Sequence, residues 1–301
     1  MRKIISILTS ISFCGAILLV LVGTGTIQVQ AQKAAKPQPE DKTEPTVRTD
    51  LVVAPKLTAD TLADIKRAGK LRVGVSRTVP WAFHSAYDDG KLMGFEIDLG
   101  RKMARDLGVE VEFFVEPFHL LIPDLIAGRF DVIMSGMSIT PERAMRVNFS
   151  NPYATGKLML ASSVAKSKGM NTPEAFNKQD VTVGVIEGST GAEVAARIFD
   201  KAKIRMFDDD SQMFHALVEG EITAAVQDSP RPEHVAKVFP GILEIPFKES
   251  LGTYPAAFAA RRGDMDFINF LNSWISARKA SGWLEARHKY WFEGNEWWES
   301  M

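Results

Sequence analysis

The chain has 301 residues, a hydrophobic fraction of 46%, a charged fraction of 24% and a formal net charge of −1. This composition is typical of a globular protein of one or two domains, and the balanced charge provides no basic surface for nucleic acid. The single cysteine, Cys14, lies in an N-terminal apolar run. The rest of the chain therefore has neither a disulfide nor a thiol nucleophile.

Residues 1–31 have the pattern of an export signal. Arg2 and Lys3 precede an apolar run from Ile4 to about Gly23, and the small-residue cleavage site Val29-Gln30-Ala31 follows. The run is nearly as long as the roughly 20 residues that span a bilayer, so the alternative is an uncleaved N-terminal anchor. In either case we expect the remainder to lie outside the cytoplasmic membrane.

The segment 32–56 is rich in Lys, Pro, Glu and Thr and has almost no apolar periodicity. Such a segment cannot bury enough apolar surface to order itself. We predict that it is a disordered linker.

Beyond the linker, short β-branched runs alternate with segments of helical periodicity. The first series is predicted as helix 59–68, strand 71–75, helix 95–107, strand 109–115, helix 119–127 and strand 130–134. The second is predicted as strand 181–186, helix 192–201, strand 204–207, helix 211–219 and strand 224–227. Alternation of this kind predicts two α/β units, each with a mainly parallel sheet flanked by helices.

Two extended stretches, 152–161 and 253–260, follow the two series and show no helical period. Two such crossings predict two lobes joined by a double-stranded hinge. The expected division is 57–153 plus 254–301 for lobe 1, and 154–253 with the hinge crossings for lobe 2. The tail from residue 264 is helical in pattern and dense in aromatic residues, which we expect to pack on lobe 1.

The stretch 135–143 (SGMSITPER) carries the strongest functional signal. It follows a buried strand, offers the hydroxyls of Ser135 and Ser138, and begins a helix that Thr140 caps. Arg143 then lies beside free backbone N–H groups, where its fork and the helix N-terminus can bind a carboxylate. These nine residues alone fit a surface arginine next to an ordinary helix cap equally well.

Two places in the second unit complement this arginine. The turn Glu187-Gly188-Ser189-Thr190-Gly191 ends a strand and begins a helix, so its free N–H groups suit an anion, although a plain capped turn also explains it. Asp228 ends a buried strand and can hold an ammonium group, unless it only caps the segment that follows. A carboxylate site on one lobe and an ammonium site on the other match an α-amino acid.

Several segments resemble a known family. They are residues 69–75 (GKLRVGV), 90–99 (GKLMGFEIDL), 130–143 and 149–153 (FSNPY). From about Leu57 to Phe292 the chain resembles the type II periplasmic solute-binding proteins for polar amino acids, which serve ABC importers. The resemblance implies a periplasmic protein with a two-lobed α/β fold.

The resemblance also implies a role for each matching residue. Arg143 would bind the ligand α-carboxylate, with help from Ser138 and the Thr190 backbone, and Asp228 would bind the α-ammonium. The other implied contacts are Ser135, Gly136, Ser189 and the aromatic walls Trp81 and Phe118. Family members often carry another hydroxyl at position 136, so the contact there must come from the main chain.

The ligand side chain is less well defined by these positions. Members that bind cationic ligands place an acid near the end of the first strand, whereas this chain has Arg77 there. Arg77 would favour an acidic or polar side chain, or it could point to solvent. His119 is a further candidate for polar recognition, although a histidine at a helix start is more often a cap or a surface residue.

The resemblance implies a binding mechanism without covalent chemistry. Ligand would dock on lobe 1, the hinge would bend, and a membrane permease would recognise the closed form. We expect a monomer without a cofactor, and no metal site, because the 5 histidines lack ligand spacing.

Two other functions compete with transport. The scaffold also resembles the periplasmic cyclohexadienyl dehydratases, which act on prephenate or arogenate, and in that reading Arg77 would hold a second carboxylate. Those enzymes use a general acid just after the turn, where this chain has Gly191 and Ala192; Glu187 and Glu193 are displaced from that position. The third possibility is a ligand-sensing module that signals to a separate partner.

Overall fold

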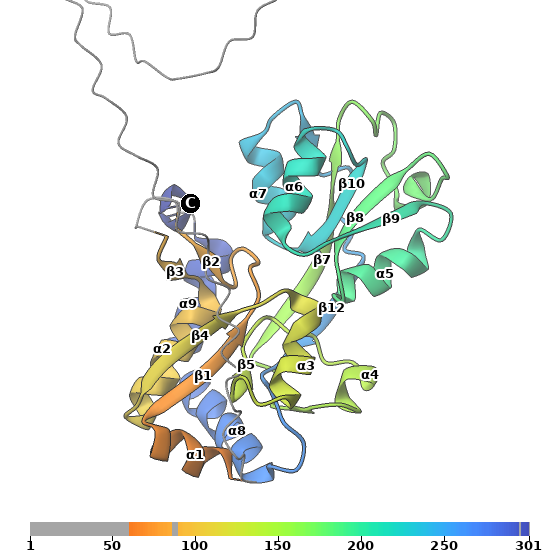
Figure 1. Cartoon of the computed structure of the whole chain (residues 1–301). Coiled ribbons are helices and arrows are strands. Elements are labelled where there is room, and N and C mark those ends of the chain that lie inside the picture. Colours follow the sequence, from red (N-terminus) through yellow and green to blue (C-terminus); the bar gives the residue numbers. More distant parts are fainter. Residues whose placement is uncertain (1–59, 86–89, 295, 301) are drawn as a thin grey trace, which may run out of the picture. The chain divides into compact units, whose positions relative to one another are not determined.

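A computed structural model describes residues 60–85, 90–294 and 296–300 (Figure 1). The predicted signal peptide or anchor, its cleavage site, Cys14 and the linker 32–56 lie outside the described residues. Within the described ranges, no helix is long and apolar enough to cross a membrane.

The first sheet contains five strands in the order β4-β1-β5-β13-β6. Their bounds are β1 Lys70–Val75, β4 Glu110–Val115, β5 Val132–Ile133, β6 Asn148–Phe149 and β13 Ala259–Ala260. Strand β1 pairs in parallel with β4 and β5, and β13 runs antiparallel to β5 and β6. A separate hairpin joins β2 (Phe83–His84) to β3 (Leu92–Met93). We call the part of the molecule built on this sheet lobe 1.

The helices of lobe 1 come from both ends of the described chain. They are α1 Thr61–Ala68, α2 Phe95–Leu107, α3 Leu121–Ile126, α4 Pro141–Ala144, α8 Met265–Ala280 and α9 Trp283–His288, with short 3-10 or π turns at Phe118–Leu120, Lys289–Glu293 and Glu296–Ser300. Helix α2 has the predicted bounds because Phe95, Leu99 and Met103 repeat at helical spacing and are fully buried.

The second sheet has the order β11-β7-β10-β8-β9, and β12 pairs with β7. Its strands are β7 Ala154–Ser163, β8 Thr182–Ile186, β9 Lys203–Phe207, β10 Ala224–Asp228, β11 Leu243–Glu244 and β12 Gly252–Ala256. Its helices are α5 Thr190–Ile198, α6 Asp210–Val218 and α7 Arg231–Val238, with a 3-10 turn at Pro173–Phe176. We call this part lobe 2.

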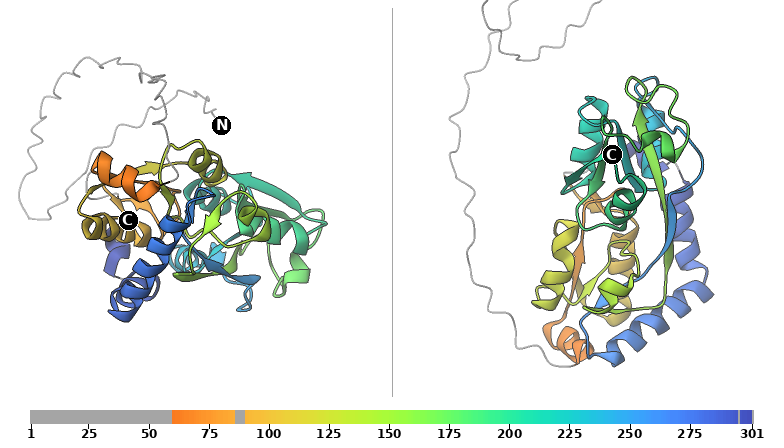
Figure 2. Two further views of the ribbon diagram at one scale, coloured as in Figure 1. Left: turned by 90° about the horizontal axis from the view of Figure 1, so that it is seen from below. Right: turned by 90° about the vertical axis from the view of Figure 1, so that its right-hand side faces the viewer.

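Strands β7 and β12 make the double-stranded hinge that the two extended stretches predict (Figures 1 and 2). They pair antiparallel from Ala154 opposite Ala256 to Leu158 opposite Gly252. Strand β7 follows β6 of the first sheet, and β12 precedes β13 of the same sheet, so the chain crosses to lobe 2 and returns along one ribbon. The exact residue division between the lobes stays a prediction.

The aromatic tail packs on lobe 1, as predicted. Trp291 and Trp297 are buried and lie against Phe83, with ring centroids 6.0 and 5.5 Å away. Phe292 contacts Trp81 at 4.7 Å. Trp298 in addition stacks on His234 of α7, so the tail also contacts lobe 2.

Other sequence predictions need correction. Helix 119–127 is divided into a 3-10 turn and α3, and the helix after the turn at Gly188 begins at Thr190 rather than Ala192. Helix α7 was not predicted. Its first residues, Arg231 and Pro232, read as a continuation of the preceding loop, although proline is well suited to the first turn of a helix.

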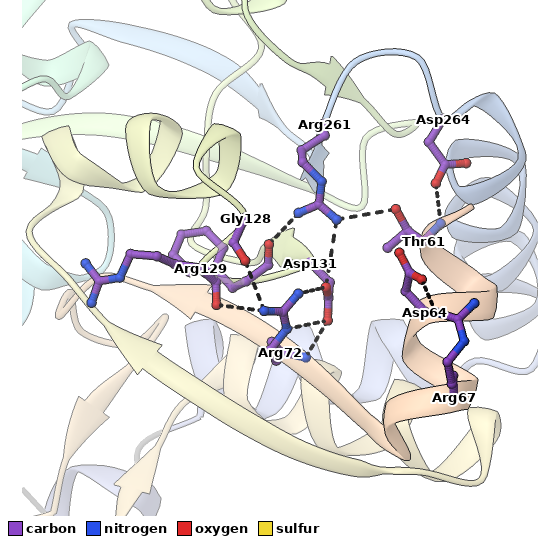
Figure 3. A network of polar contacts seen from close by, with 10 residues as sticks. Thr61, Asp64, Arg67, Arg72, Gly128, Arg129, Asp131, Arg261 and Asp264 are labelled. Atoms are coloured by element: carbon purple, nitrogen blue, oxygen red, sulfur yellow. Dashed lines mark hydrogen bonds and ion pairs between the residues drawn. The ribbon is translucent and has the colours of Figure 1, made fainter. Parts of the chain in front are cut away.

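An ionic cluster at the opposite end of β5 from the loop 135–138 fastens three strands of lobe 1 (Figure 3). The Asp131 carboxylate accepts from Arg72 Nη2 at 2.6 Å and Nε at 3.3 Å, and from the Arg72 backbone N–H at 2.9 Å. Arg261 lies 3.8 Å from the same carboxylate and donates to the Phe130 carbonyl at 2.6 Å. We call these residues the Asp131 cluster.

Candidate functional site

A narrow cavity is lined by residues of both lobes. Lobe 1 contributes residues that follow β1 and β5, and lobe 2 contributes the ends of β8 and β10 and the start of α5. The residues that the sequence predicted and that line it are Trp81, Phe118, Ser135, Gly136, Ser138, Ser189, Thr190 and Asp228. Thr78, Leu158, Ile186, Gly191 and Gln227 also line it and were not predicted.

Gly136 forms part of the lobe 1 wall in a conformation that requires glycine. Its φ is +56°, and a Cβ there would lie 2.9 Å from the Trp81 ring. Its N–H donates to Glu96 Oε1 at 2.8 Å. A side chain at this position would collide with Trp81, so this position can offer the ligand only its main chain.

Beneath Gly136 lies a buried acid that the sequence analysis missed. Glu96 is fully buried and accepts a short hydrogen bond from the Tyr153 hydroxyl. Burial raises the pKa of Glu96 to about 7, although the bonds from Tyr153 and Gly136 act in the other direction. Burial also raises the pKa of Tyr153. Glu96 was overlooked because it occurs within an ordinary helix start.

Ser135 has a role in supporting the wall. Its hydroxyl oxygen accepts from the Ser76 N–H at 2.9 Å, which ties the end of β5 to the end of β1. Parallel strands that end at one edge bring their following loops together. The chain after β5 is further held by the Ile139 N–H, which donates to the Pro255 carbonyl of β12 at 2.9 Å.

Arg143 lies behind the cavity and joins the two lobes. Thr140 caps its helix, as predicted, by accepting from the Arg143 N–H at 3.2 Å. The guanidinium donates to the Ser138 carbonyl at 2.9 Å and to the Gly188 carbonyl at 3.0 Å, and it lies over the Phe118 ring at 5.5 Å. Burial lowers the pKa of Arg143, while Glu193 at 3.8 Å opposes the shift.

The turn in lobe 2 is organised as a helix cap. Ser189 accepts from the Ala192 N–H at 3.1 Å and is the N-cap of α5. The Thr190 hydroxyl is buried and has no hydrogen-bond partner among the described residues. Since buried polar atoms are nearly always paired, this hydroxyl is available to a ligand in the cavity.

Asp228 ends β10 and faces the cavity. No described residue donates a hydrogen bond to its carboxylate, and it caps no helix, because α7 begins without a side-chain cap. Burial raises the pKa of Asp228 to about 7. Glycine at 156 leaves room for the carboxylate, since a Cβ there would lie 2.9 Å from Asp228 Oδ1.

The structure does not bring Arg77 together with these residues. Arg77 lines a separate cleft and lies 3.5 Å from Asp209 of lobe 2, with 56% of its side chain exposed. His119, Glu187 and Glu193 are likewise absent from the cavity lining. His119 Nδ1 instead lies 3.8 Å from Glu187 Oε2.

One grouping could not be found from the spacing of histidines along the chain. His119, Glu187 and the exposed Asp208 have ligating atoms within 4.8 Å of one another. They come from three different loops, so the fold rather than a local motif unites them. Exposed carboxylates next to a histidine are common without a metal, and we assign this group no ligand.

Two α/β lobes joined by a double-stranded hinge, with a polar cavity lined by both, define a two-lobed binding protein of the type II periplasmic fold. Comparison with known proteins agrees with this class. Residues 71–294 match the bacterial extracellular solute-binding proteins, family 3, and the chain belongs to that family.

Relatives within this fold include both binding proteins and an enzyme. The L-cystine-binding protein TcyJ of Escherichia coli (strain K12) is 27% identical over 231 residues, which cover 77% of this chain and 85% of that protein. The cyclohexadienyl dehydratase of Pseudomonas aeruginosa is 25% identical over 230 residues, covering 76% of this chain and 85% of the enzyme.

A solved structure shows the same fold. The ancestral amino acid-binding protein AncCDT-1, described as a precursor of cyclohexadienyl dehydratase, is 35% identical. It superimposes with a TM-score of 0.70 over 77% of this chain and 99% of its own.

Proposed function

We propose that this protein is an extracytoplasmic receptor that binds an α-amino acid between its lobes and delivers it to an ABC importer. The observation that carries the proposal is the unpaired carboxylate of Asp228, which faces the cavity while Arg143 lies behind its opposite wall. Together they supply one negative and one positive group, as a zwitterion requires.

Asp228 and Arg143 can each bind one charged group of the ligand. An ammonium group beside Asp228 would restore the ionised carboxylate, because a nearby positive charge lowers the pKa that burial has raised. Arg143 makes two hydrogen bonds to backbone carbonyls and carries five N–H donors, so donors remain for a carboxylate. The free Thr190 hydroxyl would complete that contact.

Binding on this scaffold would couple to closure of the lobes. Ligand bridging Arg143 and Asp228 makes contacts with both lobes, so it favours the conformation in which both surround it. We propose that a membrane permease recognises that conformation, that the protein acts as a monomer in the periplasm, and that it catalyses no reaction.

The second candidate is a dehydratase, which the enzyme relative favours. Prephenate carries two carboxylates, yet no described cationic side chain lines the cavity. Arg143 contacts the lining residues Ser138 and Phe118, and Arg77 belongs to the other cleft. Glu187 and Glu193, the candidates for a general acid, do not line the cavity. Of the described residues that line it, Asp228 alone is an acid, and the receptor uses it for the ammonium group.

Calorimetric titration of the purified protein with the common L-amino acids, prephenate and arogenate tests the proposal. We expect micromolar or tighter binding of an L-amino acid, lost in Arg143→Lys, which keeps the charge but not the fork, and in Asp228→Asn. Arg129→Lys, on the surface of lobe 1, is the matched control. Failure of every amino acid to bind, with phenylpyruvate or phenylalanine formed from prephenate or arogenate, would establish the dehydratase instead.

A further inference from the structure

The charges around the cavity are already used by the amino-acid headgroup. Among the described lining residues, Asp228 alone carries a formal charge. Arg143 reaches the cavity from behind Ser138 and Phe118. In the proposed function Asp228 binds the α-ammonium and Arg143 the α-carboxylate, so a third charge on the ligand would meet no counter-charge.

The other charged groups near the cavity already have partners. Glu96, beneath Gly136, accepts from the Tyr153 hydroxyl. Arg77 pairs with Asp209 in its own cleft. Glu193 lies 3.8 Å from Arg143 and is half exposed, and Glu187 lies beside His119. An ionised side chain enclosed here without a partner would lose its hydration without compensation, so its binding is unfavourable.

The rest of the lining combines apolar side chains with uncharged polar ones, which are Thr78, Ser135, Ser138, Ser189, Thr190 and Gln227. Gln227 is the most informative of the polar residues. Its Oε1 accepts from the Asp228 N–H at 2.9 Å, which defines the orientation of the amide. Its Nε2 is then left buried without a hydrogen-bond partner among the described residues. Leaving a buried donor unpaired destabilises the protein, and an acceptor on the ligand would remove that cost.

The cavity also has apolar and aromatic side chains in its walls. Trp81, Phe118, Leu158 and Ile186 line the cavity from the two lobes. Such walls accept the carbon atoms of a side chain, while a single placed donor selects among side chains of similar size.

From these features we infer that the cavity selects an L-amino acid with an uncharged side chain that carries a hydrogen-bond acceptor, an amide or a hydroxyl, and that Gln227 Nε2 recognises this acceptor. The inference rests on the proposed function and narrows its ligand class. The sequence predicted an acidic or polar side chain; the inference keeps the polar alternative and drops the acidic one, because the acidic one depended on Arg77 facing the cavity.

Isosteric ligand pairs test the two parts of the inference separately. Calorimetry with glutamine against glutamate, asparagine against aspartate, and threonine against valine changes one feature in each pair. We expect the neutral polar member of at least one pair to bind more tightly by about 100-fold, since a site built to hydrogen-bond its ligand strongly rejects an analogue that leaves it unpaired. Lysine and arginine should bind more weakly than the preferred ligand.

Two substitutions then address Gln227 directly. Gln227→Leu, close in volume, should weaken the preferred ligand by about tenfold or more, while binding of an apolar amino acid of similar size is unchanged. Gln227→Glu adds a carboxylate and should shift preference towards lysine or arginine. Gln212→Leu, on the exposed face of α6, is the matched control, and thermal unfolding of each variant confirms that it folds.

The outcomes separate this inference from the proposed function. Wild-type protein that prefers a charged amino acid overturns the inference and leaves the receptor in place. A neutral preference that survives Gln227→Leu overturns the role of Gln227. Absence of binding to any amino acid overturns the proposed function itself.

Discussion

The Asp131 cluster and the cavity both bury charged groups, but they satisfy them differently. In the cluster, the carboxylate of Asp131 receives three hydrogen bonds from Arg72 and has Arg261 nearby (Figure 3). In the cavity, Asp228, Thr190 Oγ1 and Gln227 Nε2 have no partner among the described residues. Paired burial holds strands together, whereas unpaired burial costs stability and is kept where a ligand completes it.

The largest effect should come from breaking the paired cluster. Asp131→Ala leaves two partly buried arginines without their buried carboxylate, so we expect the free energy of unfolding to fall by about 3 kcal/mol. Chemical denaturation measures this loss. Asp124→Ala, which removes a partner of the exposed Arg129, should cost less than about 1 kcal/mol. A variant at 131 of normal stability would show that the cluster does not hold the strands.

The opposite change in stability is expected at the unpaired acid. Asp228→Asn should weaken amino-acid binding by about 100-fold or more, yet raise the melting temperature of the ligand-free protein by about 5 °C at pH 8. The stabilisation arises because the pKa of Asp228, about 7 by burial, exceeds its unfolded value, so folding at pH 8 keeps a carboxylate ionised in an unfavourable site. Differential scanning calorimetry measures it.

That stabilisation has a definite pH dependence. The stabilisation should shrink as the pH falls below 7. It should vanish below about 4, where the wild-type carboxyl is protonated in both the folded and the unfolded protein. Asp180→Asn, at an exposed position, should change neither binding nor melting temperature. A lower melting temperature for Asp228→Asn would indicate that its carboxylate is paired after all.

Ligand affinity should itself depend on pH through Asp228. Binding an ammonium group requires the ionised carboxylate, so affinity should be constant above pH 7 and about 100-fold weaker at pH 5. Calorimetry in buffers of different ionisation enthalpy would show proton release near pH 6. Glu96, whose pKa is also raised to about 7, lies beneath the cavity wall. A pH profile that persists in Asp228→Asn would assign the effect to Glu96.

The smallest effect is expected at Arg77. Because Arg77 is largely exposed and lies outside the cavity, Arg77→Gln should change affinity by less than about fivefold through the contact between lobes, and ligand preference should be unaltered. The same ligand panel provides the measurement. A switch in preference would show that Arg77 reaches the ligand.

Much of the fold could be predicted from local sequence signals. The periodicity of α2, the Thr140 cap with Pro141, and the strand that ends in Asp228 are properties of neighbouring residues, and each is found as expected. The hairpin of β2 and β3 is formed by strands too short to leave a pattern. Helix α7 was missed because its start resembles a loop.

The site could be predicted from the sequence only in part. Arg143, Thr190 and Asp228 could be proposed because each follows a strand or begins a helix, where the chain leaves polar groups free. Gln227 gave no such signal, since a glutamine inside a strand is ordinary, and its importance lies in an amide nitrogen that the fold buries without a partner. Glu96 gave no signal either, because its raised pKa is caused mainly by burial, which arises only in the folded protein.

By itself the sequence determined the alternation of elements, the helix caps, the helix start that carries Arg143 and the strand end that carries Asp228. Only the tertiary structure decided that Arg77 turns to Asp209, that Gly136 must leave room for Trp81, and that Gln227 faces the cavity. The reason is physical: propensity and capping depend on residues a few positions apart, whereas burial and pairing depend on groups that meet only after the chain has folded.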